Sequence, residues 1–99
     1  MRFIVLGYDG NDDKAEERRF AVRKDHLKLA QELTSKGRWL YGCAILGENK
    51  KMIGSMIVCD FPDRQTLYKE WLDREAYILG GVWEDLKVNQ AEVPPFLEK

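Results

Sequence analysis

The chain has 99 residues, with 16 basic and 17 acidic side chains and a formal net charge of −1, which fits one domain with a hydrophobic core. No basic stripe interleaved with aromatic residues occurs, so the sequence argues against nucleic-acid binding. No apolar run approaches a membrane span or a signal-peptide core, so we expect a cytoplasmic protein that does not enter a membrane. Its two cysteines are too few for a disulfide framework or a zinc site.

The chain begins with a predicted strand and a long helix. Residues 2–8 are largely apolar and end at the turn-rich segment 9–13. The helix is strongest over residues 21–36, with a more polar first part over 14–20. Gly37 is its stop signal, because glycine readily adopts the left-handed conformation that follows a helix.

Two strands joined by a hairpin turn come next. We expect them over residues 38–46 and 52–59, with the turn at 47–51. Both strands are apolar or small on both sides, although a sheet with one wet face normally alternates apolar and polar residues. The second face of the sheet therefore needs a cover, and we predict a homodimer with facing sheets.

The last third of the chain predicts a second helix and one more core strand. A proline and an aspartate open the helix over residues 63–72, and a short helical turn follows over 75–79. The last core strand is expected over 82–88. Residues 89–99 form a C-terminal tail, since two consecutive prolines exclude a central strand there.

The predicted element order is β-α-β-β-α-β. This order is typical of the ferredoxin-like α+β fold, a four-stranded antiparallel sheet with two helices on one face. No repeat or linker interrupts residues 1–99, so we expect a single domain.

The one histidine of the chain, His26, lies within an apolar stripe of the first helix. Val22, Leu29 and Leu33 fall within about 60° of it on a helical wheel. Its side chain should therefore point inward, and imidazole exchanges protons near neutral pH. His26 is either a core histidine with satisfied hydrogen bonds or a functional group.

Several short segments, in this order and spacing, resemble the YCII-related domain family of the dimeric α+β-barrel superfamily. They are Phe3 to Leu6, Arg23 to Leu27, Gly37 to Gly42, Gly54-Ser55, Trp71 to Tyr77 and Gly81 to Glu84. The resemblance implies the ferredoxin-like fold, a homodimer and a small-molecule cleft.

The resemblance also implies a pair of catalytic residues. The family typically has an arginine, two further residues, then histidine and leucine in its first helix, as Arg23 and His26 are placed here. Its aspartate-proline-aromatic segment corresponds to residues 75–77, so Glu75 takes the position of the aspartate. Asp73 is an alternative partner for the histidine.

A histidine held by a carboxylate suits acid/base chemistry such as isomerisation, elimination or dehydrohalogenation on a small organic molecule. Arg23 is expected to bind an anionic group, and Tyr41 to line the pocket. Arg19 is expected to solvate the edge of the helix or to pair with nearby glutamates. Glu84 falls on the same strand face as Val82 and Leu86, so it is either an inward acid of the site or a residue at the sheet margin. We expect no metal or cofactor, since one histidine with scattered carboxylates gives no ligand cluster.

Two questions stay open. Glutamate is usually exposed, so Glu75 is either a partner of His26 or a surface carboxylate. The chain is accordingly an enzyme, a non-catalytic binding module that kept the fold and lost the pair, or a purely structural dimer subunit with no ligand-sized cleft beside His26.

Overall fold

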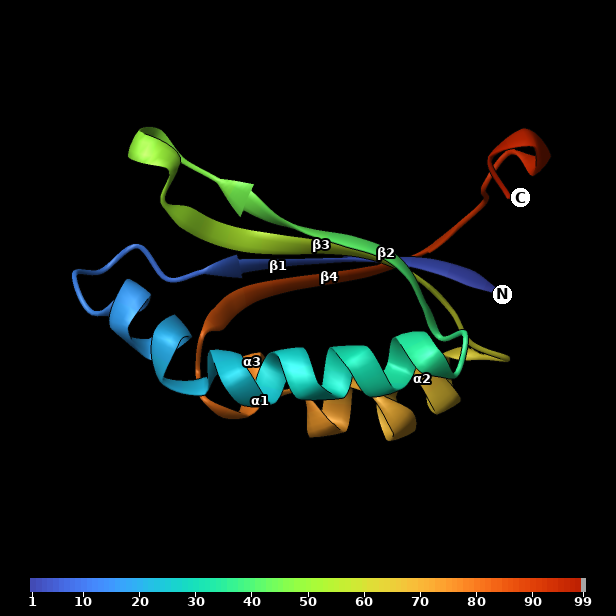
Figure 1. Cartoon of the computed structure of the whole chain (residues 1–99), viewed down its shortest axis with the longest axis horizontal. Helices are drawn as coiled ribbons and strands as arrows, with labels where there is room; N and C mark the ends of the chain where they lie inside the picture. Colours follow the sequence, from blue (N-terminus) through green and yellow to red (C-terminus); the bar gives the residue numbers. More distant parts are fainter. Residues whose placement is uncertain (99) are drawn as a thin grey trace.

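The computed structural model describes residues 1–98 as an antiparallel four-stranded sheet with its helices packed against one face (Figure 1). The strands lie in the order β2-β3-β1-β4. They are β1 (Arg2–Asp9), β2 (Trp39–Leu46), β3 (Met52–Asp60) and β4 (Trp83–Ala91). The predicted ferredoxin-like α+β fold is confirmed.

The helical layer contains α1 (Ala15–Ser35), α2 (Arg64–Glu70) and α3 (Ala76–Leu79), with 3-10 turns at η1 (Glu48–Lys50), η2 (Leu72–Arg74) and η3 (Pro95–Leu97). Gly37 follows α1 with a φ of 76°, as the predicted stop signal requires. Asp63 caps α2 by accepting a hydrogen bond of 2.7 Å from the backbone N–H of Thr66. The expected helix over 63–72 is thus divided, since α2 ends at Glu70 and the turn η2 follows.

The core lies between the helices and one face of the sheet. Phe3 and Val5 of β1 and Ile57 of β3 point into it and pack with Leu33 of α1 and Trp71 beyond α2. Cys59 is also buried there, and this burial raises the pKa of its thiol to about 12. Both cysteines are free thiols.

β4 differs from the expected strand in two ways. It continues to Ala91, which pairs with Arg2, so the first part of the predicted tail belongs to the sheet. A bulge also occurs where Asp9 pairs with Trp83 and Tyr8 with Asp85. The bulge leaves Glu84 as the extra residue, with its side chain 60% exposed, so the alternative of an inward acid there is wrong.

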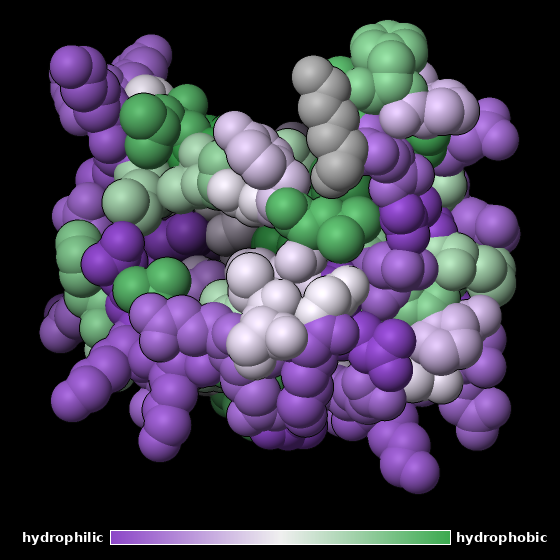
Figure 2. Space-filling model, turned by 45° about the vertical axis from the view of Figure 1, so that its right-hand side comes forward, coloured by the Kyte–Doolittle hydropathy of each residue, from purple (hydrophilic) through white to green (hydrophobic). Residues whose placement is uncertain are grey.

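No described helix covers the other face of the sheet (Figure 1). Register places Ile4 and Leu6 opposite Val58 and Met56 on that face, and Tyr41 beside Val58. Figure 2 shows hydrophobic residues gathered over the upper part of the molecule, a mostly hydrophilic lower part and a hollow between them. Within residues 1–98, no helix has both the length and the apolar character needed to cross a membrane.

Candidate functional site

His26 and Glu75 form a buried hydrogen bond between α1 and α3. The Nδ1 atom of His26 lies 2.7 Å from Oε2 of Glu75. His26 is 7% exposed, and Glu75 is fully buried. The structure thus brings together two residues that lie 49 positions apart, and it excludes Glu75 as a surface carboxylate.

The sequence around Glu75 holds its carboxylate in place. Glu75 is the residue that caps α3, and its Oε2 accepts a hydrogen bond of 2.9 Å from the backbone N–H of Tyr77. Its other oxygen accepts one of 2.7 Å from the indole N–H of Trp71, four residues earlier. Burying a carboxylate is unfavourable unless its oxygens are hydrogen-bonded, and these two donors offset the lost hydration of Glu75.

These hydrogen bonds indicate which ring nitrogen of His26 carries a hydrogen. The carboxylate of Glu75 already accepts from Trp71 and Tyr77, so it acts as an acceptor toward His26 as well. Nδ1 then carries a hydrogen directed at Oε2, so in the neutral form of the ring the lone pair is on Nε2. Nε2 has no hydrogen-bond partner among residues 1–98 and is not enclosed by protein, so it is the ring nitrogen open to a ligand.

Aromatic rings fix the plane of the imidazole. The ring of Tyr77 stacks on that of His26 with centroids 3.9 Å apart and an interplanar angle of 12°. Trp39 and Trp83 lie around it at centroid distances of 5.8 and 6.1 Å. These contacts leave His26 little freedom to rotate, which preserves the direction of Nε2.

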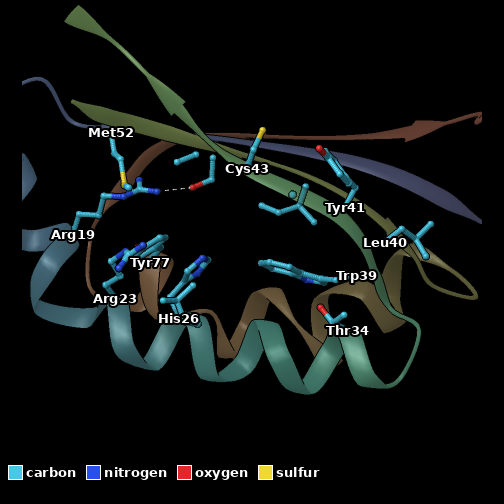
Figure 3. Close-up of a pocket in the computed structure, with 15 residues that line it drawn as sticks. Arg19, Arg23, His26, Thr34, Trp39, Leu40, Tyr41, Cys43, Met52 and Tyr77 are labelled. Atoms are coloured by element: carbon cyan, nitrogen blue, oxygen red, sulfur yellow. Dashed lines mark hydrogen bonds between the residues drawn. The ribbon is translucent and has the colours of Figure 1, made fainter. Parts of the chain in front are cut away.

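A cavity of about 380 Å³ lies beside His26, between α1 and strands β2 and β3. Its size falls in the range of small-molecule sites. Figure 3 shows Arg19, Arg23 and Tyr77 at one end of this cavity and Trp39 and Leu40 at the other, with His26 between them.

Arg19 does not lie where the sequence analysis expected it. It is only 4% exposed, and its guanidinium binds both oxygens of Asp9 at 2.9 and 3.0 Å. It also donates to Ser55 Oγ at 3.0 Å and to the carbonyl of Gly54 at 3.3 Å. The predicted pairing with nearby glutamates is wrong, because the helix carries this side chain over the inner face of the sheet.

Of the other predicted site residues, two border the cavity and one does not. Arg23 lines the cavity and forms no ion pair within the described part of the chain. Tyr41 borders only the rim of the cavity, because its ring is 70% exposed and points to the uncovered side of β2 (Figure 3). Asp73 is exposed on the turn η2 and has no hydrogen bond to His26. Residues 1–98 contain no group of three histidine, cysteine or acidic side chains arranged to hold a metal ion.

Sequence reasoning missed the parts that Trp71, Tyr77 and Ser55 have in this site. The only signal for Trp71 was its position four residues before Glu75, and the two do not share one helix, because α2 ends at Glu70 and the turn η2 lies between them. Ser55 carries no comparable signal, since its role depends on Arg19 reaching it from another element.

A sequence model of the YCII-related domain matches residues 1–92. The chain belongs to the YCII-related domain family. No curated protein matches it in sequence.

Solved structures with the same fold as this YCII-related chain include the following two. One is the 5-chloro-2-hydroxyhydroquinone dehydrochlorinase from Burkholderia phenoliruptrix AC1100 in complex with 2,5-dihydroxybenzoquinone. It has a TM-score of 0.81 at 16% identity, over 97% of this chain and 98% of that chain. The second is an antibiotic biosynthesis monooxygenase, with a TM-score of 0.55 at 13% identity, over 94% of this chain and 98% of that chain. At these identities the likeness shows the fold alone.

Proposed function

We propose that this YCII-related chain is a small cytoplasmic enzyme in which His26 and Glu75 carry out acid/base chemistry on a small organic molecule. The observation that carries the proposal is the buried 2.7 Å contact between the two side chains at the wall of a cavity. Arg23 binds an anionic group of the substrate, and Tyr41 lines the entrance. Asp73 has no part in this proposal, because its side chain is exposed.

In the proposed step, Nε2 of His26 removes a proton from a carbon of the substrate. The electron pair of the broken C–H bond forms a new double bond, and the electron pair of the bond to a leaving group departs with that group as an anion. In an isomerisation, His26 instead returns the proton to another atom of the substrate. Glu75 stabilises the imidazolium that forms in between, and positioned proton transfer of this kind contributes about 10²–10⁴-fold in rate.

The dehydrochlorinase with the same fold supports an elimination reaction, because a dehydrochlorinase removes hydrogen chloride and its substrate is a small ring compound. The cavity of about 380 Å³ beside His26 has room for such a compound. The substrate class of this chain is therefore best sought among small ring compounds with an acidic C–H bond.

The test uses chloride release from 5-chloro-2-hydroxyhydroquinone and deuterium incorporation from D₂O into a panel of cyclic ketones and hydroxyquinones. We expect the wild-type protein to accelerate at least one of these reactions. The His26→Gln variant should lose about 10²–10⁴-fold of that rate while it keeps its circular dichroism spectrum. Turnover that survives in the folded variant would rule out the assigned role of His26.

A non-catalytic binding module is the alternative function, and the structural role of Glu75 supports it. Its carboxylate caps α3 and binds Trp71, so it has a use without catalysis. This alternative predicts ligand binding at the cavity with no reaction that depends on His26. The same panel separates the two functions.

We further propose that the chain is a homodimer joined through the uncovered faces of its sheets. Ile4, Leu6, Met56 and Val58 form an apolar patch on that face, and such patches usually mark interfaces. In sedimentation at micromolar concentration we expect a dimer, and Met56→Glu should shift it toward monomer. A monomeric wild-type protein would contradict this proposal.

A further inference from the structure

The wall of the cavity carries positive charge without a matching carboxylate. Arg19 and Arg23 line it, whereas none of its lining residues is acidic. Asp9 neutralises Arg19, and Glu75 lies behind His26, fully buried and away from the cavity surface. The guanidinium of Arg23 therefore remains as a charge that a ligand can neutralise.

Arg19 has a second effect, because it directs a hydroxyl group. Oγ of Ser55 accepts the hydrogen bond from Arg19, so the hydrogen of that hydroxyl points elsewhere. Ser55 lies in the cavity wall and makes no other hydrogen bond through its side chain to residues 1–98. Its hydroxyl is thus a donor available to a ligand.

Tyr77 supplies another donor at the same end. Its ring lies between two partners, since it stacks on His26 and the guanidinium of Arg19 lies 4.7 Å from its centroid. Its hydroxyl has no hydrogen-bond partner among the described residues, and it is not sealed off from the cavity. Burial raises the pKa of this phenol, which therefore stays protonated and able to donate at neutral pH.

We propose that the cavity binds a planar organic anion, with its charged group held between Arg23 and the hydroxyl groups of Tyr77 and Ser55. The inference rests on the proposed function, because it names the substrate class of the same site. A guanidinium and two hydroxyl donors at one end, with no carboxylate in the cavity wall, favour a negatively charged group over a neutral polar one.

The rest of the cavity fits the uncharged part of such a ligand. Trp39 and Ile57 line it beyond His26, and both are apolar and present flat or branched surfaces. Figure 3 shows His26 between the arginine end and Trp39, so an anion bound at the first end extends its ring past the imidazole. This orientation brings a ring carbon, rather than the charged group, to Nε2.

The experiment compares benzoate with benzamide, which has the same shape but no charge, by ¹⁵N chemical-shift titration of the full chain. We expect benzoate to shift the signals of Arg23, His26 and Tyr77, with a Kd at least about tenfold below that of benzamide. Equal affinities for the two probes, or no benzoate shifts up to its solubility limit, would overturn the inference.

Two variants test the individual donors. Tyr77→Phe keeps the stacked ring and removes one donor, so it should weaken benzoate binding about tenfold. Arg23→Gln should abolish most of the preference for benzoate over benzamide. Tyr68→Phe is the matched control, because Tyr68 lies on α2 outside the cavity wall, and it should leave the Kd unchanged. Unchanged benzoate affinity in Tyr77→Phe would refute the role of its hydroxyl.

His26→Gln separates this inference from the proposed function. Because His26 stacks on Tyr77 and faces the ligand, the absolute Kd of this variant should rise, but benzoate should keep its preference over benzamide, since Arg23 and the two hydroxyl groups remain. Benzoate binding without any reaction that depends on His26 would leave the anion site standing and reject the enzyme. Turnover of neutral compounds alone, with no benzoate binding, would support the enzyme and reject the anion site.

Discussion

Replacing Glu75 with glutamine changes one heavy atom in the centre of the site. The wild-type carboxylate accepts hydrogen bonds from His26, Trp71 and the backbone of Tyr77. A glutamine amide has only one oxygen, and its NH₂ group is a donor. In either orientation of the amide, its NH₂ group faces at least one of these three donors, so at least one hydrogen bond of the wild type is lost.

The expected cost follows from the number of donors left without a partner. If the amide oxygen takes the place of Oε2, the indole N–H of Trp71 is orphaned, and His26 and Tyr77 keep their partners. One buried donor left unsatisfied costs about 1–3 kcal/mol. For a domain of this size, each kcal/mol lowers the melting temperature by roughly 4–8 °C.

Urea unfolding followed by tryptophan fluorescence measures this loss. Wild type, Glu75→Gln and the control Asp73→Asn should be compared at one protein concentration, because dimerisation makes apparent stability depend on concentration. Asp73 is an exposed carboxylate two residues away, so its variant should stay within about 0.5 kcal/mol of the wild type. A Glu75→Gln protein as stable as the control would refute our account of how this carboxylate is held.

Three further predictions address groups around the site. Trp71→Phe removes the donor to Glu75 and should lower stability by about 1 kcal/mol or more in the same urea assay, as well as slowing any His26-dependent turnover. Arg19→Met leaves the buried carboxylate of Asp9 without its partner and should cost about 3–5 kcal/mol, part of which a second change of Asp9 to asparagine recovers. If the double variant is as unstable as Arg19→Met alone, the unpaired charge of Asp9 is not the cause of the lost stability. Because burial raises the pKa of Cys59 to about 12, iodoacetamide should leave this thiol unmodified in the folded protein and label it in guanidinium, as read by mass spectrometry.

Local patterns were sufficient to predict the elements of this fold. Apolar spacing and turn residues predicted four strands and the long helix within a few residues, and Gly37 and Asp63 occupy the terminal positions that their chemistry favours. Apart from the division of the second helix after Glu70, the errors occurred where pairing between strands decides the outcome. The bulge opposite Tyr8 turned Glu84 outward, and pairing with Arg2 extended β4 beyond its predicted end.

The site was less predictable, because its contacts join distant parts of the chain. The apolar stripe of α1 placed His26 inward, but only the family resemblance indicated Glu75 as its neighbour. Helical spacing also placed Arg19 near the edge of that stripe, yet it did not indicate that Asp9 and Ser55 would receive its guanidinium. Such a choice of partner depends on how the helix lies over the sheet, which periodicity alone does not determine.

The most direct test of the central claim is a measurement of which ring nitrogen of His26 carries the hydrogen, by ¹⁵N NMR of the imidazole at neutral pH. Our account predicts a hydrogen on Nδ1, bonded to Glu75, with Nε2 as the ring nitrogen that faces the cavity and exchanges its proton there. A hydrogen on Nε2, with Nδ1 unprotonated, would contradict the assignment of His26 as a base poised toward a bound substrate.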